Sequence, residues 1–512
     1  MAFILKSKQL VAIKFMLFNK IPKAPEFPES FKWLNTGEDL SIEKLKGHVI
    51  VLDFWTYCCI NCMHILPDLE KIEEKYSEKP VIVIGVHSAK FEEESGPENI
   101  EQAIARYQIK HPVIVDQKME IWNNYGASGW PTIVVIDPEG SIVYKQSGEG
   151  QLERLMDTID VLLETYEEKG ALSKNKISMQ HPKIKNKSFL SFPGKISFSP
   201  DKKSFCLSDS NNNRILVCSI EGKIKEIIGS GKKGLRDGEF PKAEFNRPQG
   251  VCFSENKIYV ADTENHAIRE IDLKNKKVET IAGTGIQAFY NIKFGKGKDT
   301  PLSSPWDLVE YRNKLYIAMA GTHQIWTYDL KIDNVEIFAG SGYENIVDGS
   351  LSEAQFAQPS GITLLDNSLF LADSEVSGIR RIDFNTKKVS TISGRGLFEF
   401  GLKDGKTDKA LFQHPLGISN DGKGKLFVAD TYNNSIRQID LKEELVSALI
   451  KKKEKNICMI GDEKCNVLGL WEPSDVKYAD EKLYIVDTNN HLIRVFDLKI
   501  RSLKDLEIRF TN

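Results

Sequence analysis

The sequence predicts two domains: an α/β domain, followed by an all-β propeller of six blades. Two observations support this order. Apolar strands alternate with amphipathic helices through the first third of the chain, and a unit of about 55 residues then repeats six times. At 512 residues, the chain is long enough for two to four domains of ~100–200 residues each.

The α/β domain is expected over residues 25–172. Short apolar runs rich in Val and Ile predict strands, and apolar residues at helical spacing predict helices. The expected strands are Val49–Phe54, Val81–Gly85, Val113–Val115, Thr132–Ile136 and Ile142–Lys145. The expected helices run from Cys59 to about Tyr76, from Asn99 to Tyr107 and from Gln151 to Glu168. This alternation predicts a central sheet flanked by helices.

A Cys-x-x-Cys motif, formed by Cys59 and Cys62, stands where the first apolar strand passes into a helix. The free N–H groups and the dipole at a helix N-terminus favour a thiolate over a thiol. The thiolate is the nucleophile of disulfide exchange, and Cys62, one turn later, is placed to resolve the mixed disulfide. The motif therefore indicates a redox-active dithiol, with purely structural cysteines or a metal site as the alternatives.

A zinc site would need four ligands, and no second Cys-x-x-Cys or Cys/His pair follows at a suitable spacing. The local set of Cys58, Cys59, Cys62 and His64 would be cramped within one turn. We therefore expect neither a metal nor a cofactor.

Two residues outside the motif support the redox interpretation. Asp53 lies six residues before Cys59 inside an apolar strand, where an unpaired carboxylate is costly. Pro131 heads the strand Thr132–Ile136, a position that tolerates proline. Both placements resemble the thioredoxin fold, which keeps a buried acid at the first position to move protons to and from the resolving thiol. At the second position that fold has a cis-proline that faces the dithiol.

The repeat begins after a basic, polar segment, residues 173–190, which we interpret as a linker. Each copy has an apolar strand ending in Asp, then Ser or Thr and Asn, then Ile-Arg-x-Ile/Phe-Asp. Complete copies span 258–272, 369–383, 426–440 and 483–497, and degenerate copies span 205–219 and 315–329. In the degenerate copies Leu216 occupies the arginine position and Met319 replaces the first aspartate.

Four short strands per copy, separated by turn signals, predict propeller blades over residues 191–512. Six copies would close into a ring that leaves no free sheet edge. The recurring Asp and Arg are interpreted as ion pairs that hold strand ends, because a catalytic residue would not be needed in every copy.

The cysteines outside the dithiol turn are scattered, mostly within apolar strands. Such cysteines usually behave as small buried hydrophobes, and this usage suits a reducing compartment. Cys458 and Cys465 share one loop and form the pair best suited to a disulfide. The five residues are Cys206, Cys218, Cys252, Cys458 and Cys465.

Charge and hydropathy limit the possible partners. The net charge is −3, with −9 on the first 170 residues and +6 on the remaining 342. So small a basic excess argues against nucleic-acid binding. Residues 1–24 carry five lysines and no acidic residue, and they are expected to form a lead-in segment rather than a signal peptide. No apolar run is long enough for a transmembrane helix, so we expect a cytoplasmic protein without membrane contact.

Several runs closely resemble the NHL repeat-containing protein 2 family. These are Cys58-Cys-Ile-Asn-Cys62, His87-Ser-Ala-Lys-Phe91 and Ala24-Pro-Glu-Phe-Pro28. The family joins a thioredoxin-like domain of the TlpA/ResA type to a six-bladed NHL β-propeller. The resemblance implies that Cys59 is the nucleophile, Cys62 the resolving cysteine, Asp53 the buried acid and Pro131 the cis-proline.

The chain departs from thioredoxin proper at three places around the dithiol. Cys58 stands where thioredoxin has Trp, Ile60-Asn61 replaces Gly-Pro, and Trp130 before the proline is bulkier than usual. Redox potential and substrate choice therefore do not carry over from thioredoxin.

The expected function is thiol–disulfide exchange, with the propeller recruiting protein partners that carry disulfides or thiols. The main alternative is a non-enzymatic scaffold with a vestigial redox domain, and copper handling through Cys58 and Cys62 is a third possibility. If the propeller recruits partners, the loops 287–300 and 451–465 are candidate contact surfaces because both exceed what the repeat needs. The first of these loops carries Phe289, Tyr290 and Phe294.

Overall fold

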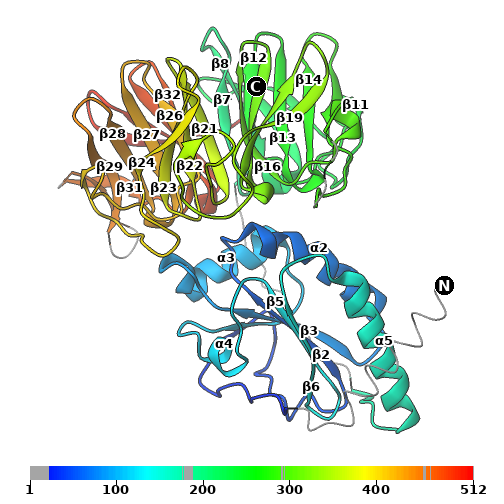
Figure 1. The fold of residues 1–512 in the computed structure, drawn as a ribbon. Helices are drawn as coiled ribbons and strands as arrows, with labels where there is room; N and C mark the ends of the chain where they lie inside the picture. Colours follow the sequence, from blue (N-terminus) through cyan, green and yellow to red (C-terminus); the bar gives the residue numbers. More distant parts are fainter. Residues whose placement is uncertain are drawn as a thin grey trace. The chain divides into compact units, whose positions relative to one another are not determined.

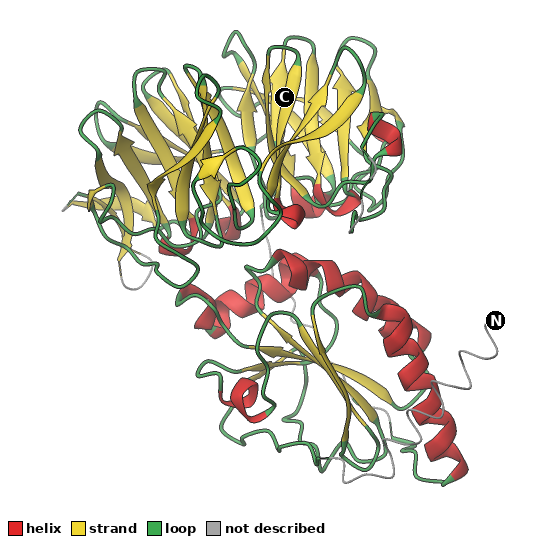
Figure 2. Cartoon of the chain, viewed as in Figure 1, coloured by secondary structure: helices red, strands yellow, loops and turns green. Residues whose placement is uncertain are grey.

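The chain forms two units in the computed structural model, Met1–Lys185 and Asn186–Asn512, and each is described by itself (Figure 1). The structure describes residues 22–175, 177, 188–289, 292, 294–453, 457–461 and 463–510. Most of the expected lead-in segment and of the expected linker lies outside these residues, as does Tyr290. Helices are prominent in the first unit, whereas the second consists of strands, turns and one-turn helices (Figure 2).

The first unit is a six-stranded mixed sheet with the order β1-β4-β3-β2-β5-β6. Strand β2 pairs in parallel with β3 and antiparallel with β5. The strands are β1 Trp33–Leu34, β2 Val49–Trp55, β3 Val81–His87, β4 Val113–Val115, β5 Thr132–Ile136 and β6 Ile142–Ser147. The helices are α2 Ile60–Lys75, η1 Glu93–Ser95, α3 Pro97–Tyr107, α4 Glu120–Asn124 and α5 Leu152–Glu168.

All five strands and three helices expected in this unit are present, with ends that shift by at most two residues. Sequence reasoning missed β1 and α4. β1 has two residues, too few for an alternating pattern, and α4 is a helix of five residues whose start is held by a side chain of the preceding loop. The carboxylate of Asp116 accepts hydrogen bonds from the backbone N–H groups of Ile121 and Trp122 at 3.1 and 2.9 Å. That capping comes from the loop after β4 rather than from a residue next to the helix.

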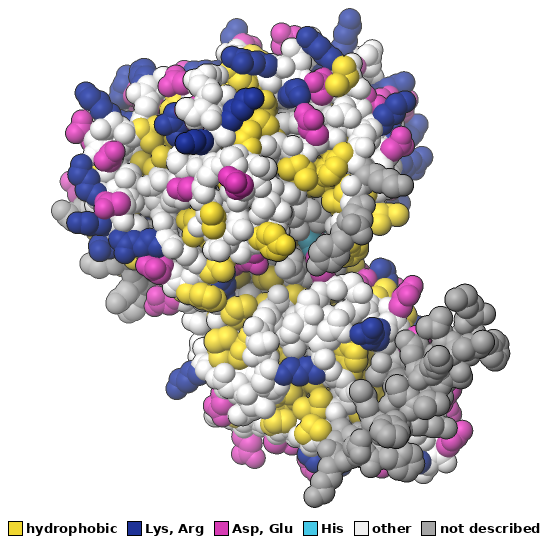
Figure 3. Space-filling model, viewed as in Figure 1, with side chains coloured by type: hydrophobic (Ala, Val, Ile, Leu, Met, Phe, Trp, Pro, Cys, Tyr) yellow, Lys and Arg dark blue, Asp and Glu magenta, His cyan; other side chains and the backbone are white. Residues whose placement is uncertain are grey.

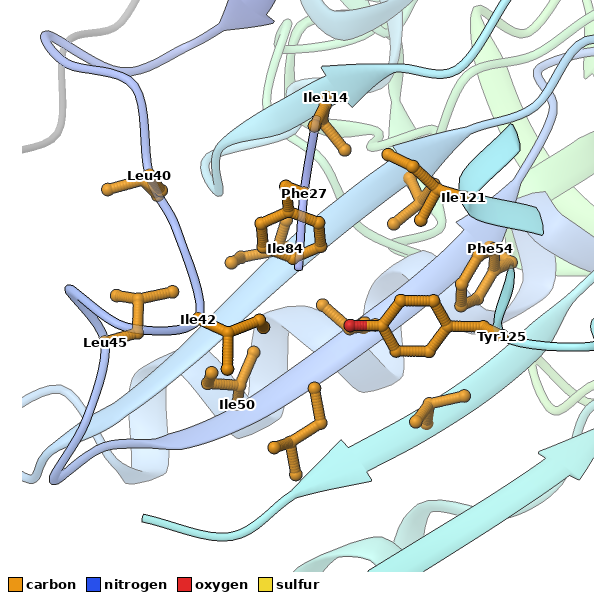
Figure 4. Close-up of a cluster of buried hydrophobic side chains, with 14 of the residues drawn as sticks. Phe27, Leu40, Ile42, Leu45, Ile50, Phe54, Ile84, Ile114, Ile121 and Tyr125 are labelled. Carbon is orange, nitrogen blue, oxygen red and sulfur yellow. The ribbon is translucent and has the colours of Figure 1, made fainter. Parts of the chain in front are cut away.

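Every residue of β2 is buried, because this central strand is covered on both faces. Ile50, Leu52 and Phe54 face the cluster that includes residues of α4. Figure 4 shows side chains of this cluster converging on one face of the sheet. Val49 and Val51 face the opposite side, where they pack with residues of α2 and α5. Because side chains alternate along a strand, Asp53 and Trp55 lie on the α2 face.

The second unit consists of antiparallel sheets of four strands or more. Their first long strands, β7, β12, β16, β21, β26 and β32, contact one another in this order, and β32 contacts β7. The sheets therefore close into a ring, which makes this unit a β-propeller. Basic and acidic side chains are interspersed over its visible face (Figure 3).

The strands of the propeller follow one another in chain order from sheet to sheet. The first three sheets comprise β7 Ile196–Phe198, β8 Ser204–Asp209, β9 Arg214–Ser219 and β10 Ile224–Ile228; β11 Gly238–Glu239, β12 Val251–Ser254, β13 Lys257–Asp262, β14 Ala267–Asp272 and β15 Lys277–Ala282; and β16 Pro305–Tyr311, β17 Lys314–Met319, β18 Gln324–Asp329 and β19 Asn334–Ala339. The others comprise β20 Gly349–Ser350, β21 Pro359–Leu365, β22 Ser368–Asp373, β23 Gly378–Asp383 and β24 Lys388–Ser393; β25 Gly405–Lys406, β26 Gly417–Asn420, β27 Lys425–Asp430, β28 Ser435–Asp440, β29 Leu445–Lys453, β30 Ile457–Ile460 and β31 Glu463–Leu468; and β32 Pro473–Ala479, β33 Lys482–Asp487, β34 Leu492–Asp497 and β35 Ser502–Leu506.

Glycines allow the first long strands to approach one another closely at the centre of the ring. A Cβ on Gly417 would lie 2.5 Å from the Cα of Asp475, which no other residue could tolerate. Lys195, at the corresponding position of the first sheet, is buried. Its ammonium donates to the carbonyl of Leu416 and lies 3.4 Å from the carboxylate of Asp307. A buried charge pair therefore ties separate sheets together near the axis.

The recurring Asp and Arg form ion pairs inside the blades, as interpreted from the repeat. The guanidinium of Arg269 lies 2.7 Å from Asp262 and 2.8 Å from Asp237, and it also donates to two backbone carbonyls. Arg380 and Arg437 repeat this arrangement in their own blades. These residues join the Asp-Gly turn to the ends of two strands.

The two degenerate copies have other side chains at the position that the ion pair occupies in the complete copies. In the first, Leu216 stands at the arginine position, and Arg214 instead pairs with Asp209 at 2.8 Å. In the other, Met319 and Trp326 replace the acid and the base together, and both are fully buried. Replacing a buried ion pair with apolar side chains of similar volume is often neutral for stability.

The disulfide expected from the shared loop is present between Cys458 and Cys465. It closes the β30–β31 hairpin, which extends the fifth sheet and contacts β35 of the next. The prediction that this pair differs from the other cysteines is confirmed.

We expect Arg437→Met to lower the free energy of unfolding of the full chain by ~3–5 kcal/mol, because it leaves the buried carboxylate of Asp430 without its cation. The matched control is Arg381→Met, since Arg381 is partly exposed and pairs with Asp383 near the surface. That change should cost at most ~1 kcal/mol. Urea unfolding of both variants measures the difference, and equal losses would contradict the structural role of the buried pair.

Candidate active site

The two cysteines of the motif occupy different environments at the start of α2. Cys59 is the residue before the first turn, and its carbonyl accepts hydrogen bonds from the backbone N–H groups of Cys62 and Met63 at 3.1 and 3.2 Å. Its side chain is partly exposed, whereas Cys62 is buried one turn into the helix. Both are free thiols. The pair therefore offers one accessible sulfur and one that a substrate cannot reach directly.

Burial disfavours the ionised forms of Asp53 and Cys62. Both carboxylate oxygens of Asp53 lack a hydrogen-bond partner among the described residues, and burial raises the pKa of this acid from 3.8 to about 8. Burial also raises the pKa of Cys62 well above its ordinary value, and the Cys59 thiol and the charge of Asp53 raise it further. The acid and the resolving thiol are thus close enough for the charge of one to affect the ionisation of the other. At neutral pH both hold their protons.

The residue before Pro131 lies against the accessible thiol. The Trp130–Pro131 peptide bond is cis, and the Sγ of Cys59 lies 3.8 Å from the carbonyl oxygen of Trp130. The indole N–H of Trp130 donates to the carbonyl of Ser88 at 2.9 Å, and its ring packs against Trp122. This bulky side chain is therefore packed onto its own domain, and its backbone stays beside the dithiol.

Glu94 is a residue of the site that sequence reasoning missed. It is fully buried, and its carboxylate accepts hydrogen bonds from the backbone N–H groups of Cys58, Phe91 and Lys90 at 2.7, 3.1 and 3.3 Å. It therefore fixes the turn of the dithiol to the loop after β3. The sequence carries no signal for this role, because Glu94 ends a run of three glutamates that is typical of a solvated segment.

The histidines near the dithiol are buried rather than on the surface. The Nδ1 of His64 lies 2.7 Å from the carboxylate of Glu149, which joins α2 to the loop after β6. His87 stacks against Tyr57 and meets the edge of Trp55, and burial lowers its pKa to about 3. His111 is also buried, just before β4. The structure places Cys59, Cys62, Asp53 and Pro131 on adjoining elements: Asp53 in β2, Cys59 at the start of α2, Cys62 within α2, and Pro131 just before β5.

Family comparisons agree with this architecture. A thioredoxin-like family model matches residues 47–142, and an NHL repeat model matches residues 245–271. The chain is 41% identical over 493 residues to the protein SUPPRESSOR OF QUENCHING 1, chloroplastic, of Arabidopsis thaliana, which covers 93% of this chain and 46% of that protein. It is 40% identical over 521 residues to human NHL repeat-containing protein 2, covering 94% of this chain and 71% of that one.

The first domain has more distant bacterial relatives. It is 28% identical over 127 residues to the thiol-disulfide oxidoreductase ResA of Halalkalibacterium halodurans, covering 24% of this chain and 69% of that protein. None of the helices that the structure describes has the length and apolar character needed to cross a membrane.

The raised pKa of Asp53 predicts how stability depends on pH. Between pH ~4 and ~8 the unfolded chain has released this proton while the folded domain retains it, so stability falls as pH rises, by roughly 5 kcal/mol in total. We expect Asp53→Asn to match the wild type near pH 4 and to exceed its free energy of unfolding by several kcal/mol at pH 8.

The matched control is Asp137→Asn. Asp137 is also buried, but its carboxylate accepts hydrogen bonds from Glu139, Ser141 and Tyr166 at 2.8–3.0 Å. This variant should lose stability at every pH. Urea unfolding from pH 4 to 8 measures both variants, and a parallel pH dependence of Asp53→Asn and wild type would contradict the burial of an unpaired acid.

Proposed function

The chain belongs to the family of NHL repeat-containing protein 2, and from this premise we propose that its first domain is a thiol–disulfide oxidoreductase that uses Cys59 and Cys62. The observation that carries the proposal is the pairing of an accessible thiol with a buried thiol whose pKa is raised by the charge of a buried acid. An enzyme of disulfide exchange needs these three groups, whereas a structural pair of cysteines does not need the acid.

The proposed reaction reduces a disulfide of the partner. The thiolate of Cys59 attacks one sulfur of the substrate, so that a mixed disulfide forms and the other substrate sulfur leaves as a thiolate. Asp53 first releases its own proton toward solvent, and its carboxylate then takes the proton of Cys62, which attacks the sulfur of Cys59. The mixed disulfide breaks, the second substrate thiolate leaves, and the Cys59–Cys62 disulfide holds the oxidised state. An external dithiol must reduce this disulfide before the next cycle.

The bacterial relative supports this activity, since it is named as a thiol-disulfide oxidoreductase. The chain spans 46% of the plant relative and 71% of the human one, so the activities of those whole proteins are not transferred to it. The compartment is a separate proposal: the cysteine usage favours a reducing compartment such as the cytoplasm, whereas the plant relative is named chloroplastic.

We also propose six blades, and domain boundaries at residues 25–172, 173–190 and 191–512. The grouping of the strands into separate antiparallel sheets supports the number of blades, as does the return of β32 to β7. The change from a mixed sheet to antiparallel sheets between α5 and β7 supports the boundaries.

The propeller is proposed to recruit protein partners, because function in such folds collects on the loops while the blades stay rigid. The loop after β15 supports this role: Ile286 and Phe289 expose 70% and 47% of their surfaces. Phe294 is different, since its ring packs against Trp326 at 5.0 Å. A non-enzymatic scaffold is the second candidate function, and Ile60-Asn61 in place of Gly-Pro favours it.

Cys62→Ser should accumulate mixed disulfides with partner proteins, because Cys59 still attacks and nothing resolves the product. Cys59→Ser is the matched control and should trap few, since Cys62 is buried. Non-reducing electrophoresis followed by mass mapping measures the trapped species. Equal trapping by the two variants, or none by either, would favour the scaffold.

Replacing Ile286 and Phe289 with Ser in the Cys62→Ser background should weaken the capture of partners and leave the rate toward a small disulfide unchanged. Exposed aromatic and aliphatic side chains are common anchors of interfaces. The control is Ile332→Ser, because Ile332 is 70% exposed but lies in the turn between β18 and β19. Capture that is unaffected by the loop change would exclude this loop as the recruiting surface.

A further inference from the structure

Several buried polar atoms on the α2 side of the first sheet lack hydrogen-bond partners among the described residues. They include both carboxylate oxygens of Asp53, the indole nitrogen of Trp55 and both ring nitrogens of His111. All three residues are buried. Buried polar groups in proteins nearly always form hydrogen bonds with protein groups or with ordered water. Several such atoms without partners in one place therefore indicate a bound water or a function.

Gly85 brings these groups together. It pairs directly with Asp53 across the parallel strands β2 and β3. A Cβ on Gly85 would lie 2.8 Å from the Nε1 of Trp55 and 3.4 Å from the Nε2 of His111. The indole N–H and the imidazole therefore converge over the one residue of β3 that has no side chain, beside the buried acid. The third neighbour of this point is the apolar Cγ2 of Val113, at 3.3 Å. Two polar nitrogens near the point, with Asp53 on the paired position of β2, are of the number and kind that hold a buried water.

The opposite side of His111 leads toward solvent. Its Nδ1 lies 3.3 Å from the carboxylate of Glu73, on α2, although the two are not aligned as a hydrogen bond. The side chain of Glu73 is 21% exposed, whereas that of His111 is 3% exposed. An imidazole can accept a proton on one ring nitrogen and release one from the other.

The proposed reaction requires a path along which a proton can move between the buried Asp53 and solvent. Each resolution step requires Asp53 to release one proton, and this acid has no exposed surface from which to release it. His87 is the other histidine on this face, but burial lowers its pKa to about 3, so it stays neutral and does not carry the proton. Lys110, near the outer end, is held by Glu70 at 2.7 Å.

We propose that His111 is a proton-relay residue that connects Asp53 to solvent through Glu73, with a buried water beside Gly85 bridging Asp53 and His111. The inference rests on the function proposed above. The proton of Asp53 passes through the water to Nε2 of His111, and the proton of Cys62 takes its place on Asp53. The proton on Nδ1 leaves to the carboxylate of Glu73 and from there to bulk water. One proton enters and one leaves in each resolution step, so the number of protons on His111 is unchanged while its N–H moves from Nδ1 to Nε2. The reverse transfer, when the Cys59–Cys62 disulfide is reduced again and Cys62 regains its proton, restores the Nδ1–H tautomer.

The test is stopped-flow oxidation of the reduced full chain by a small disulfide, at pH 7, in H2O and in D2O. His111→Asn should slow the resolution step by about tenfold, less than the ~10²–10⁴-fold typical of a group that transfers the proton in the transition state. The slowed step should show a larger solvent isotope effect, and added imidazole should restore its rate in His111→Ala. The Cys59–Cys62 reduction potential should not change.

The matched control is His48→Asn. His48 is another buried histidine of the same domain, but its ring nitrogens contact the carbonyls of Leu45 and Asn175 at 3.2 and 3.1 Å. Its rate should stay within twofold of the wild type. Glu73→Gln, at a partly exposed position, should slow the same step as His111→Asn and provides the test if the histidine variants do not fold.

Three outcomes would overturn the inference. His111→Asn and Glu73→Gln could both resolve at the wild-type rate, or His48→Asn could slow the step as much as His111→Asn. Either result removes the relay while leaving the proposed function intact, because the wild type still exchanges disulfides. A wild-type chain that reduces no disulfide would instead refute the function, and the relay with it.

Discussion

The first domain is organised around one constraint: a carboxyl group held in the middle of a sheet, with no hydrogen bond from the described residues to offset its burial. Asp53 occupies the strand that is covered on both faces, so no water surface lies near it. Replacing it with an apolar residue would relieve this cost, which makes a purely structural role hard to justify. The acid is useful only if a proton must reach the buried Cys62 or leave it. The surrounding groups are arranged around it, since Glu94 fixes the dithiol turn and Gly85, which pairs with Asp53, lets the side chains of Trp55 and His111 approach.

In the propeller, in contrast to the first domain, buried carboxylates are paired with cations. Each buried aspartate of the complete copies is paired with an arginine, as Asp430 is with Arg437, and the pair also satisfies backbone carbonyls of the same blade. Where one copy loses the acid it loses the base as well, so Met319 and Trp326 pack together as apolar neighbours. At this position of the repeat, charge is compensated within each blade that carries it, which leaves the loops free to vary. The paired acids of the second domain therefore stabilise the blades, whereas the unpaired acid of the first domain is suited to proton transfer.

Both domains could be predicted in outline because their signals are local and repeated. The strand before Cys59 and the spacing of Cys59 and Cys62 indicate a strand-to-helix turn wherever they occur, and a 55-residue period indicates blades without reference to contacts. The short elements β1 and α4 were missed, since one has two residues and the other has five, too few to show helical periodicity. Pairing of Arg214 with Asp209 was missed for a similar reason, because it breaks the spacing of the repeat.

The sequence by itself determined the order of the domains, the dithiol and the residues that surround it along the chain. The tertiary structure decided which side chains face the dithiol from elsewhere. Glu94 lies in an acidic run and His111 in a short loop, and nothing in their neighbours distinguishes them from solvated residues. Only the packing of β3 and its flanking loops against α2 buries both and brings His111 to Gly85 and Glu73. Periodicity and spacing report on neighbours along one element, whereas the cost of burying a polar group depends on everything packed around it.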